Sequence, residues 1–137
     1  MKKIVRYLTV LSVLFLPNLG WANNAGEGMP RWRGAYTCIQ GMTGLTLTID
    51  LQSQTARFEF YPLRSTDPVA RGSFVLGGRL PLKGSDMVLD PVRWLSQPPG
   101  YVMVGLRGTT NDNGLTYQGV VTGGAGCSNF TLRRDPR

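Results

Sequence analysis

The feature that most constrains the fold is a strict alternation of apolar and polar residues in two neighbouring segments. In GLTLTIDL, every second residue from Leu45 to Leu51 is aliphatic, and the residues between them are threonine or aspartate. The segment ARFEFY repeats the pattern, with Ala56, Phe58 and Phe60 on one side. Side chains of a strand point alternately to opposite faces, so each segment predicts a strand with one buried face. Residues 52–55 suit a hairpin loop.

The same pattern, interrupted by proline, glycine and asparagine turn signals, predicts further strands along the chain. With the two above they make about eight; the others cover about 33–39, 72–77, 86–89, 101–107, 115–121 and 128–133. Short strands with short connections predict an all-β fold, a small antiparallel barrel, because closure leaves no exposed sheet edge. A two-sheet β-sandwich is the alternative. The stretch PVRWLSQ is interpreted as one short helical turn, since Pro91 suits a first helical position.

The first residues have the composition of a secretory signal peptide. Three basic residues precede an apolar run that ends near Leu16, and small residues before and at Ala22 fit a cleavage site. We therefore expect a signal peptide over 1–22, a flexible mature N-terminus over 23–30 and a single β domain over 31–134. The expected location is periplasmic or secreted, with no transmembrane segment in the mature chain.

The charge of the chain is partly carried by this expected signal. The formal net charge is +7, and loss of Lys2, Lys3 and Arg6 would leave +4. The remaining positive residues are nearly all arginine and are scattered without a run. Proteins that bind nucleic acid usually gather such residues on one face or tail, so no nucleic-acid partner is expected.

The chain contains two cysteines, Cys38 and Cys127, one near each end of the expected mature domain. In an exported protein such a pair predicts one disulfide. Closing a loop of about ninety residues in this way is worth on the order of 4–5 kcal/mol in the chain-entropy model. Cys38 is therefore interpreted as a structural residue.

The absence of histidine from the whole sequence excludes the Ser-His-Asp and Cys-His catalytic arrangements and the common zinc sites. A nucleophilic cysteine would also need a base to form its thiolate. A pair of carboxylates could act as in glycosidases, but no spacing of the acidic residues indicates a pocket that would raise a pKa. The prediction is a protein that is not an enzyme, with no catalytic residue, no metal site and no cofactor.

Aromatic residues are the best candidates for a binding site. Trp32 and Tyr36 share one face of the first predicted strand, while Trp94 and Tyr101 bracket the turn LSQPPG, with Arg93 beside Trp94. If exposed, these rings would form a platform for sugar rings or for side chains of another protein. If buried, they would plug the end of a barrel. We expect Trp32 and Tyr36 to be buried and the loop around Pro98 to be the contact surface.

The first predicted hairpin resembles a known family. YTCIQGMTGLTLTI and ARFEFY, with the late Cys127, resemble the periplasmic C-type lysozyme inhibitor family over residues 36–61. That resemblance implies a small barrel closed by a disulfide. The family blocks the lysozyme cleft with a serine- and glycine-rich loop and a later lysine. Here Ser73, Lys83 and Ser85 differ from it in order and spacing, so no inhibitory residue is carried over.

RWLSQPPGYVMVGLRG is similar to a segment of exported bacterial domains that occur alone or appended to larger proteins. That similarity implies a portable module and no particular activity. The leading hypothesis is thus an exported binding module that contacts a protein or a cell-wall glycan through its Pro98–Tyr101 loop. The alternatives are a lysozyme-type inhibitor, although a basic inhibitor would meet a basic lysozyme unfavourably, and an enzyme.

Overall fold

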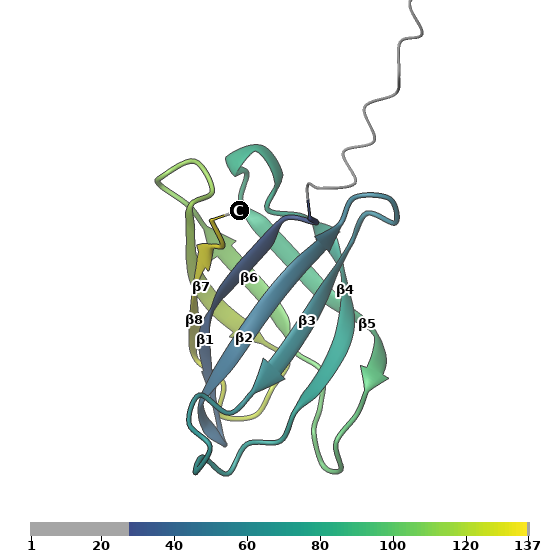
Figure 1. Ribbon diagram of the computed structural model, residues 1–137, viewed down its shortest axis with the longest axis vertical. Coiled ribbons are helices and arrows are strands. Elements are labelled where there is room, and N and C mark those ends of the chain that lie inside the picture. The colour runs from purple at the N-terminus through teal and green to yellow at the C-terminus, as the bar shows by residue number, and fades with distance from the viewer. Residues whose placement is uncertain (1–27, 137) are drawn as a thin grey trace, which may run out of the picture.

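The computed structural model describes residues 28–136, and the expected signal peptide lies outside them. The described chain is all-β and forms one closed barrel in which each strand pairs antiparallel with its neighbours in sequence (Figure 1). The strands are β1 (Arg31–Cys38), β2 (Gly41–Asp50), β3 (Thr55–Tyr61), β4 (Gly72–Arg79), β5 (Met87–Ser96), β6 (Gly105–Thr109), β7 (Thr116–Thr122) and β8 (Asn129–Arg134). The predicted barrel of eight strands is confirmed, and the sandwich is not formed.

The barrel follows from the alternation seen in the sequence. On β2, Leu45, Leu47 and Ile49 are fully buried, and on β3 Phe58 and Phe60 point into the same interior. The rings of Phe58 and Phe74 stack at the centre, with centroids 4.4 Å apart. Every strand adds inward-facing apolar residues to this single core, so closing the sheet buries all of its apolar faces at once.

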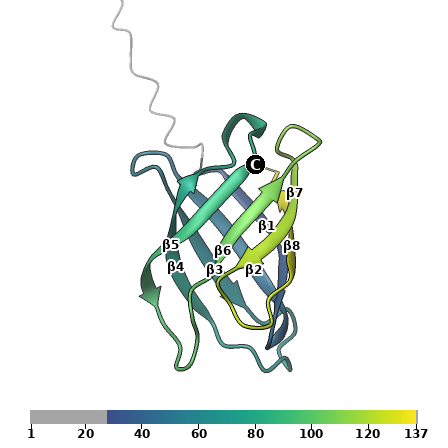
Figure 2. The same ribbon diagram turned by 180° about the vertical axis from the view of Figure 1, so that it is seen from behind.

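The helical turn predicted for PVRWLSQ is wrong, because β5 continues through this stretch to Ser96. Pro91 is accommodated because the pairing of β5 with β6 ends at Leu89, so here β5 has a paired neighbour only on the β4 side. The register against β4 also shifts twice along this half of β5. Prolines in sheets occur at such edges and bulges. Beyond Leu89, β5 is no longer paired with β6, and the chain reaches β6 through the β5–β6 loop (Figure 2).

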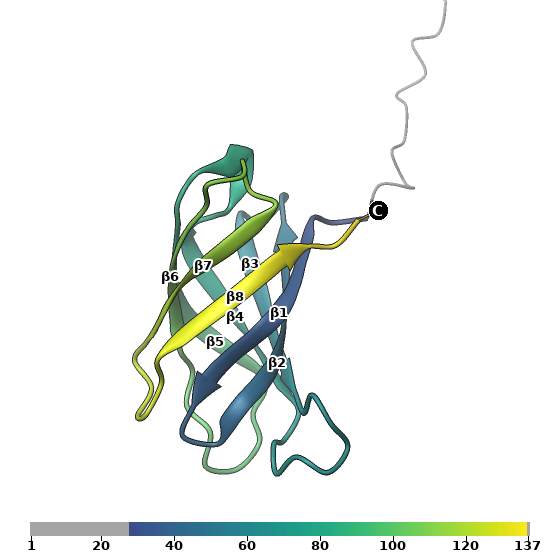
Figure 3. The ribbon, with the colours of Figure 1, turned by 90° about the vertical axis from the view of Figure 1, so that its left-hand side faces the viewer.

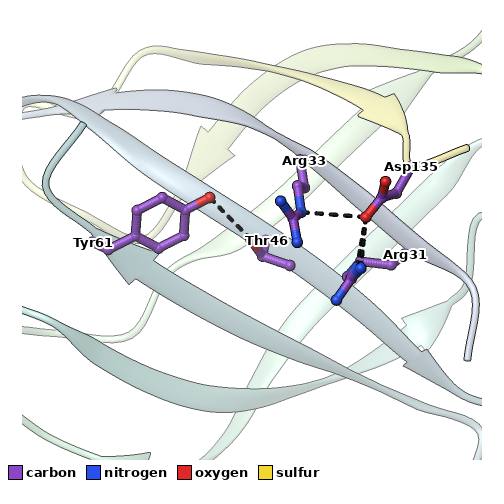
Figure 4. A network of polar contacts seen from close by, with 5 residues as sticks. All are labelled: Arg31, Arg33, Thr46, Tyr61 and Asp135. Atoms are coloured by element: carbon purple, nitrogen blue, oxygen red, sulfur yellow. Dashed lines mark hydrogen bonds and ion pairs between the residues drawn. The ribbon is translucent and has the colours of Figure 1, made fainter. Parts of the chain in front are cut away.

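The barrel closes where β8 lies beside β1 (Figure 3). The predicted disulfide, Cys38–Cys127, is confirmed and joins the end of β1 to the β7–β8 loop at one end of this seam. At the other end, Asp135 accepts a hydrogen bond from Arg31 Nε at 2.8 Å and forms an ion pair with Arg33 at 3.3 Å (Figure 4). A covalent bond and an ionic cluster therefore hold the two ends of the seam.

The end of the barrel that carries the β4–β5 and β6–β7 loops is plugged by two aromatic side chains. Trp32 Nε1 donates a hydrogen bond to the carbonyl of Gly114 at 2.8 Å. Tyr117 Oη donates to the carbonyl of Ser85 at 2.7 Å, and the two rings meet edge to face. Each ring thus fills the interior while its polar atom holds a loop, so this end is closed.

Candidate functional site

The opposite end of the barrel, which we call the disulfide end, contains a cavity of about 300 Å³. Four loops meet at this end, at the bottom of Figure 1: β1–β2, β3–β4, β5–β6 and β7–β8. The cavity is lined by Tyr36, Cys38, Ile39, Gln40, Phe60, Gly100, Tyr101, Val102, Val104, Gly124, Ala125 and Cys127. Mouths of small β-barrels are a common position for binding sites.

The β5–β6 loop covers part of the cavity because Tyr101 folds back into the barrel. Its ring stacks on Phe60, with centroids 5.2 Å apart and an interplanar angle of 13°. Its hydroxyl accepts a hydrogen bond from the backbone N–H of Ala70 at 3.0 Å. The ring therefore ties the β5–β6 loop to the β3–β4 loop and forms one wall of the cavity.

The disulfide forms another wall. Cys38 is buried at the end of β1, and Cys127 brings the β7–β8 loop against it. Gly124 of that loop lies so close that a Cβ there would meet the sulfur of Cys127 and the side chain of Val104. The absence of a side chain at this glycine lets the loop approach the barrel, so the loop's position depends on both the disulfide and the glycine.

The polar groups of the cavity are few and neutral. Gln40 donates from Nε2 to the hydroxyl of Tyr36 at 3.4 Å and to Thr43 Oγ1 at 3.1 Å. Burial raises the pKa of the Tyr36 hydroxyl well above its ordinary value, so this group stays protonated. The twelve lining residues include no charged side chain. Such a cavity suits an uncharged, mainly apolar group.

The rim of the cavity is exposed and apolar. Ile39 is 82% exposed and Val102 is 62% exposed, and both line the mouth. Met42 and Leu63, which are also exposed, lie on a neighbouring hollow of about 320 Å³ that shares Gln40 with the cavity and is also lined by Arg64 and Asp67. Exposed apolar residues that gather around a hollow mark an interaction surface more often than scattered ones do.

The structure brings together only some of the residues predicted as a site. Tyr36 and Tyr101 line the cavity with both cysteines. Trp94 points into the barrel, edge to face with Phe74, and Arg93 is exposed on β5. Trp32 is buried in the plug at the other end. Trp32 and Tyr36 are buried, as expected. Of the predicted contact surface around Pro98, only Gly100, Tyr101 and Val102 line the cavity.

Sequence reasoning missed Ile39 and Gln40, which form the tip of the β1–β2 turn. The available signal was an isoleucine in a two-residue turn, where polar residues or glycine are usual. It also missed Val102 and Val104, because a strand was expected over about 101–107, whereas β6 begins at Gly105 and both valines lie in the β5–β6 loop.

Alanine substitutions of Tyr101 and Trp94 measure how far these rings belong to the core. We expect each to lower the free energy of unfolding by about 1–3 kcal/mol, less than a fully buried aromatic residue, because both are only partly buried. Val102→Ala, an exposed neighbour, should stay within about 0.5 kcal/mol of the wild type. Urea unfolding followed by tryptophan fluorescence and circular dichroism measures all three. Stability unchanged in Tyr101→Ala would contradict the packed position of its ring.

Comparisons with known proteins leave the family open. No family model matches the chain, and no solved structure matches it. Over 67 residues, 48% of this chain, the sequence is 43% identical to protein argonaute 1A of Oryza sativa subsp. japonica. The match covers 6% of that protein, so its activity is not transferred to this chain.

The described part of the chain offers neither a membrane-spanning helix nor a metal cluster. Among residues 28–136 there is no helix long and apolar enough to span a membrane. Within the same range, no three histidine, cysteine or acidic side chains are grouped closely enough to hold a metal ion.

Proposed function

We propose that this protein is a non-catalytic binding module that receives an apolar side chain of a partner protein in the cavity at the disulfide end. The observation that carries the proposal is the combination of an uncharged cavity with an exposed apolar rim. An aromatic or aliphatic side chain buried in such a cavity contributes about 25 cal/mol per Å² of apolar surface removed from water. Anchors of this kind dominate the affinity of many protein interfaces.

A protein side chain fits the cavity better than a sugar does. A buried sugar would need a hydrogen-bond partner for most of its hydroxyl groups, because an unsatisfied buried polar group costs about 1–3 kcal/mol. The cavity offers chiefly the amide of Gln40 and two tyrosine hydroxyls. The hydroxyl of Tyr36 already accepts a hydrogen bond from Gln40, and that of Tyr101 accepts one from Ala70, so each offers chiefly its own O–H, which is too little for a sugar with several hydroxyls. An apolar group makes no such demand.

The module is proposed to work outside the cytoplasm. A disulfide is typical of oxidising compartments. The basic and apolar composition of residues 1–22 supports export through a signal peptide cleaved after Ala22. Catalysis is not part of the proposal, because the cavity has no carboxylate among its lining residues and the sequence has no histidine.

Aspartate substitutions on the rim test the proposed surface. Ile39→Asp and Val102→Asp place a charge at the mouth, so we expect each to weaken binding at least about tenfold, equivalent to about 1.4 kcal/mol. The matched controls are Leu51→Asp and Leu115→Asp, which are 49% and 58% exposed at the plugged end and should change affinity less than about twofold.

The measurement has two parts. Titration with the uncharged fluorescent probe N-phenyl-1-naphthylamine reports directly on the cavity, and Ala125→Trp should block it by filling the mouth. Cross-linking of the wild type and the four variants in extracts of the source cells then asks which proteins depend on the rim. If no cross-linked protein is lost by the rim variants and kept by the controls, the proposed surface is refuted. Release of the probe by neutral oligosaccharides would refute the choice of a protein ligand.

A further inference from the structure

The outer face of the barrel carries a shallow polar groove of about 240 Å³ over β3, the start of β4 and the end of β5. The strand register places three residues of its floor side by side, since Glu59 pairs with Ser73 and Ser73 pairs with Ser96. Arg57, Tyr61 and Arg71 complete the polar and aromatic lining. The groove shares Phe60 with the cavity at the disulfide end, but none of its polar lining residues lines the cavity, so the groove is a second surface.

The aromatic ring of Tyr61 is held in a fixed position on the outer face. It lies opposite Gly44 of β2, where a Cβ would collide with the ring. The glycine therefore lets the tyrosine lie across the neighbouring strand. Its hydroxyl is hydrogen-bonded to Thr46 Oγ1 at 3.0 Å, as Figure 4 shows, and Thr46 is itself buried. A half-buried ring fixed in this way loses little conformational entropy when a ligand packs on it.

The groove offers both hydrogen-bond donors and acceptors. Arg57 Nε and Glu59 Oε1 form an ion pair of 2.8 Å, with both side chains partly exposed. The hydroxyls of Ser73 and Ser96 lie in the same lining. A sugar hydroxyl is both donor and acceptor, so a guanidinium, a carboxylate and hydroxyls together match it in a way that a purely cationic surface does not.

The groove also has an excess of positive charge. Arg71 lies with Cζ 6.0 Å from the centroid of the Tyr61 ring and makes no ion pair in the described part of the chain. Arg57 is paired with Glu59, so Arg71 leaves the lining of the groove with one positive charge in excess, which an anionic ligand would neutralise.

We propose that this groove binds an acidic saccharide. In this arrangement a sugar ring packs on Tyr61, its hydroxyls bind the Arg57–Glu59 pair and the serines, and its carboxylate binds Arg71. A single-stranded nucleic acid fits less well, because the groove contains a carboxylate and one fixed ring, whereas such ligands use several stacking rings along a basic track.

The test compares tetragalacturonate with its methyl ester, which keeps the rings and removes the charge, on the intact mature protein by isothermal titration calorimetry. We expect the ester to bind at least tenfold more weakly than the acid. Arg71→Gln should abolish the difference between them. Arg93→Gln, a neighbouring exposed arginine on β5 outside the groove, should change neither affinity by more than twofold.

Two further variants separate recognition from folding. Tyr61→Ala removes the ring and should reduce binding at least tenfold, while Tyr61→Phe keeps the ring without the Thr46 hydrogen bond and should retain most binding. Ile39→Asp, which tests the cavity, should bind the saccharide normally, so either proposal can fail alone. Equal binding of acid and ester, no binding of either, or displacement of the acid by oligothymidylate would each overturn the acidic-saccharide assignment.

Discussion

Replacing Cys38 and Cys127 together with serine should lower the free energy of unfolding by about 2–5 kcal/mol, as the loss of a native disulfide does in small exported domains. The bond joins residues 89 positions apart, so it removes many conformations from the unfolded chain. The disulfide also lies at one end of the β1–β8 seam, so its removal would free the β7–β8 loop from β1. Urea unfolding of the oxidised wild type and of the double variant measures the difference.

Two controls accompany this experiment. Thiol labelling of the denatured, unreduced wild type should find no free sulfhydryl. The N-phenyl-1-naphthylamine titration should weaken in the double variant even where the barrel is folded, because both cysteines line the cavity. A double variant as stable as the wild type would show that the pairing of β1 with β8 closes the barrel unaided.

Trp32→Ala should cost about 3–5 kcal/mol of stability, the range for aromatic residues removed from a core. Its ring is 1% exposed, meets Tyr117 edge to face and donates a hydrogen bond to Gly114. Removing it leaves a void and an unpartnered carbonyl at the plugged end. A fall in Tm on the order of 10–20 °C follows for a domain of this size.

The control for Trp32 is Arg134→Ala. The guanidinium of Arg134 lies 4.7 Å from the centroid of the Trp32 ring, a contact worth about 0.5–1 kcal/mol at an exposed site. The loss of stability in Arg134→Ala should be several times smaller than that in Trp32→Ala. Probe binding at the disulfide end should survive in any fraction of Trp32→Ala that remains folded. Equal losses in the two variants would mean that the plug depends on the arginine rather than on the ring.

The first hairpin, β2 and β3, was predictable because its signal is local, whereas the bounds expected for β5 and β6 were several residues off. Alternation with a period of two is set by the geometry of one strand, so β2 and β3 could be located from residues 45–61 alone. The disulfide was predictable for a different reason, since only two cysteines are present and only one pairing is possible.

The continuation of β5 through Pro91 was not predictable, because a bulge exists only relative to the register of a neighbouring strand. Of the two proposed surfaces, the sequence pointed only to Tyr36, Tyr101 and the cysteines of the cavity, and the groove was not predictable. The fixed ring of Tyr61 depends on Gly44, which faces it from β2 across the sheet. Gln40 lines the cavity only because the fold brings the β1–β2 turn beside the β5–β6 and β7–β8 loops.

By itself, the sequence determined an all-β chain with one apolar face per strand and one possible disulfide, because these properties depend on residue type and on short-range spacing. Only the tertiary structure decided which end of the barrel is solid and which is hollow. Trp32 and Tyr117 fill one end because their polar atoms reach loop carbonyls there. At the other end Tyr101 is held to one side by Ala70, and the space beside it stays open. That difference depends on contacts between residues far apart in the chain, which no local pattern encodes.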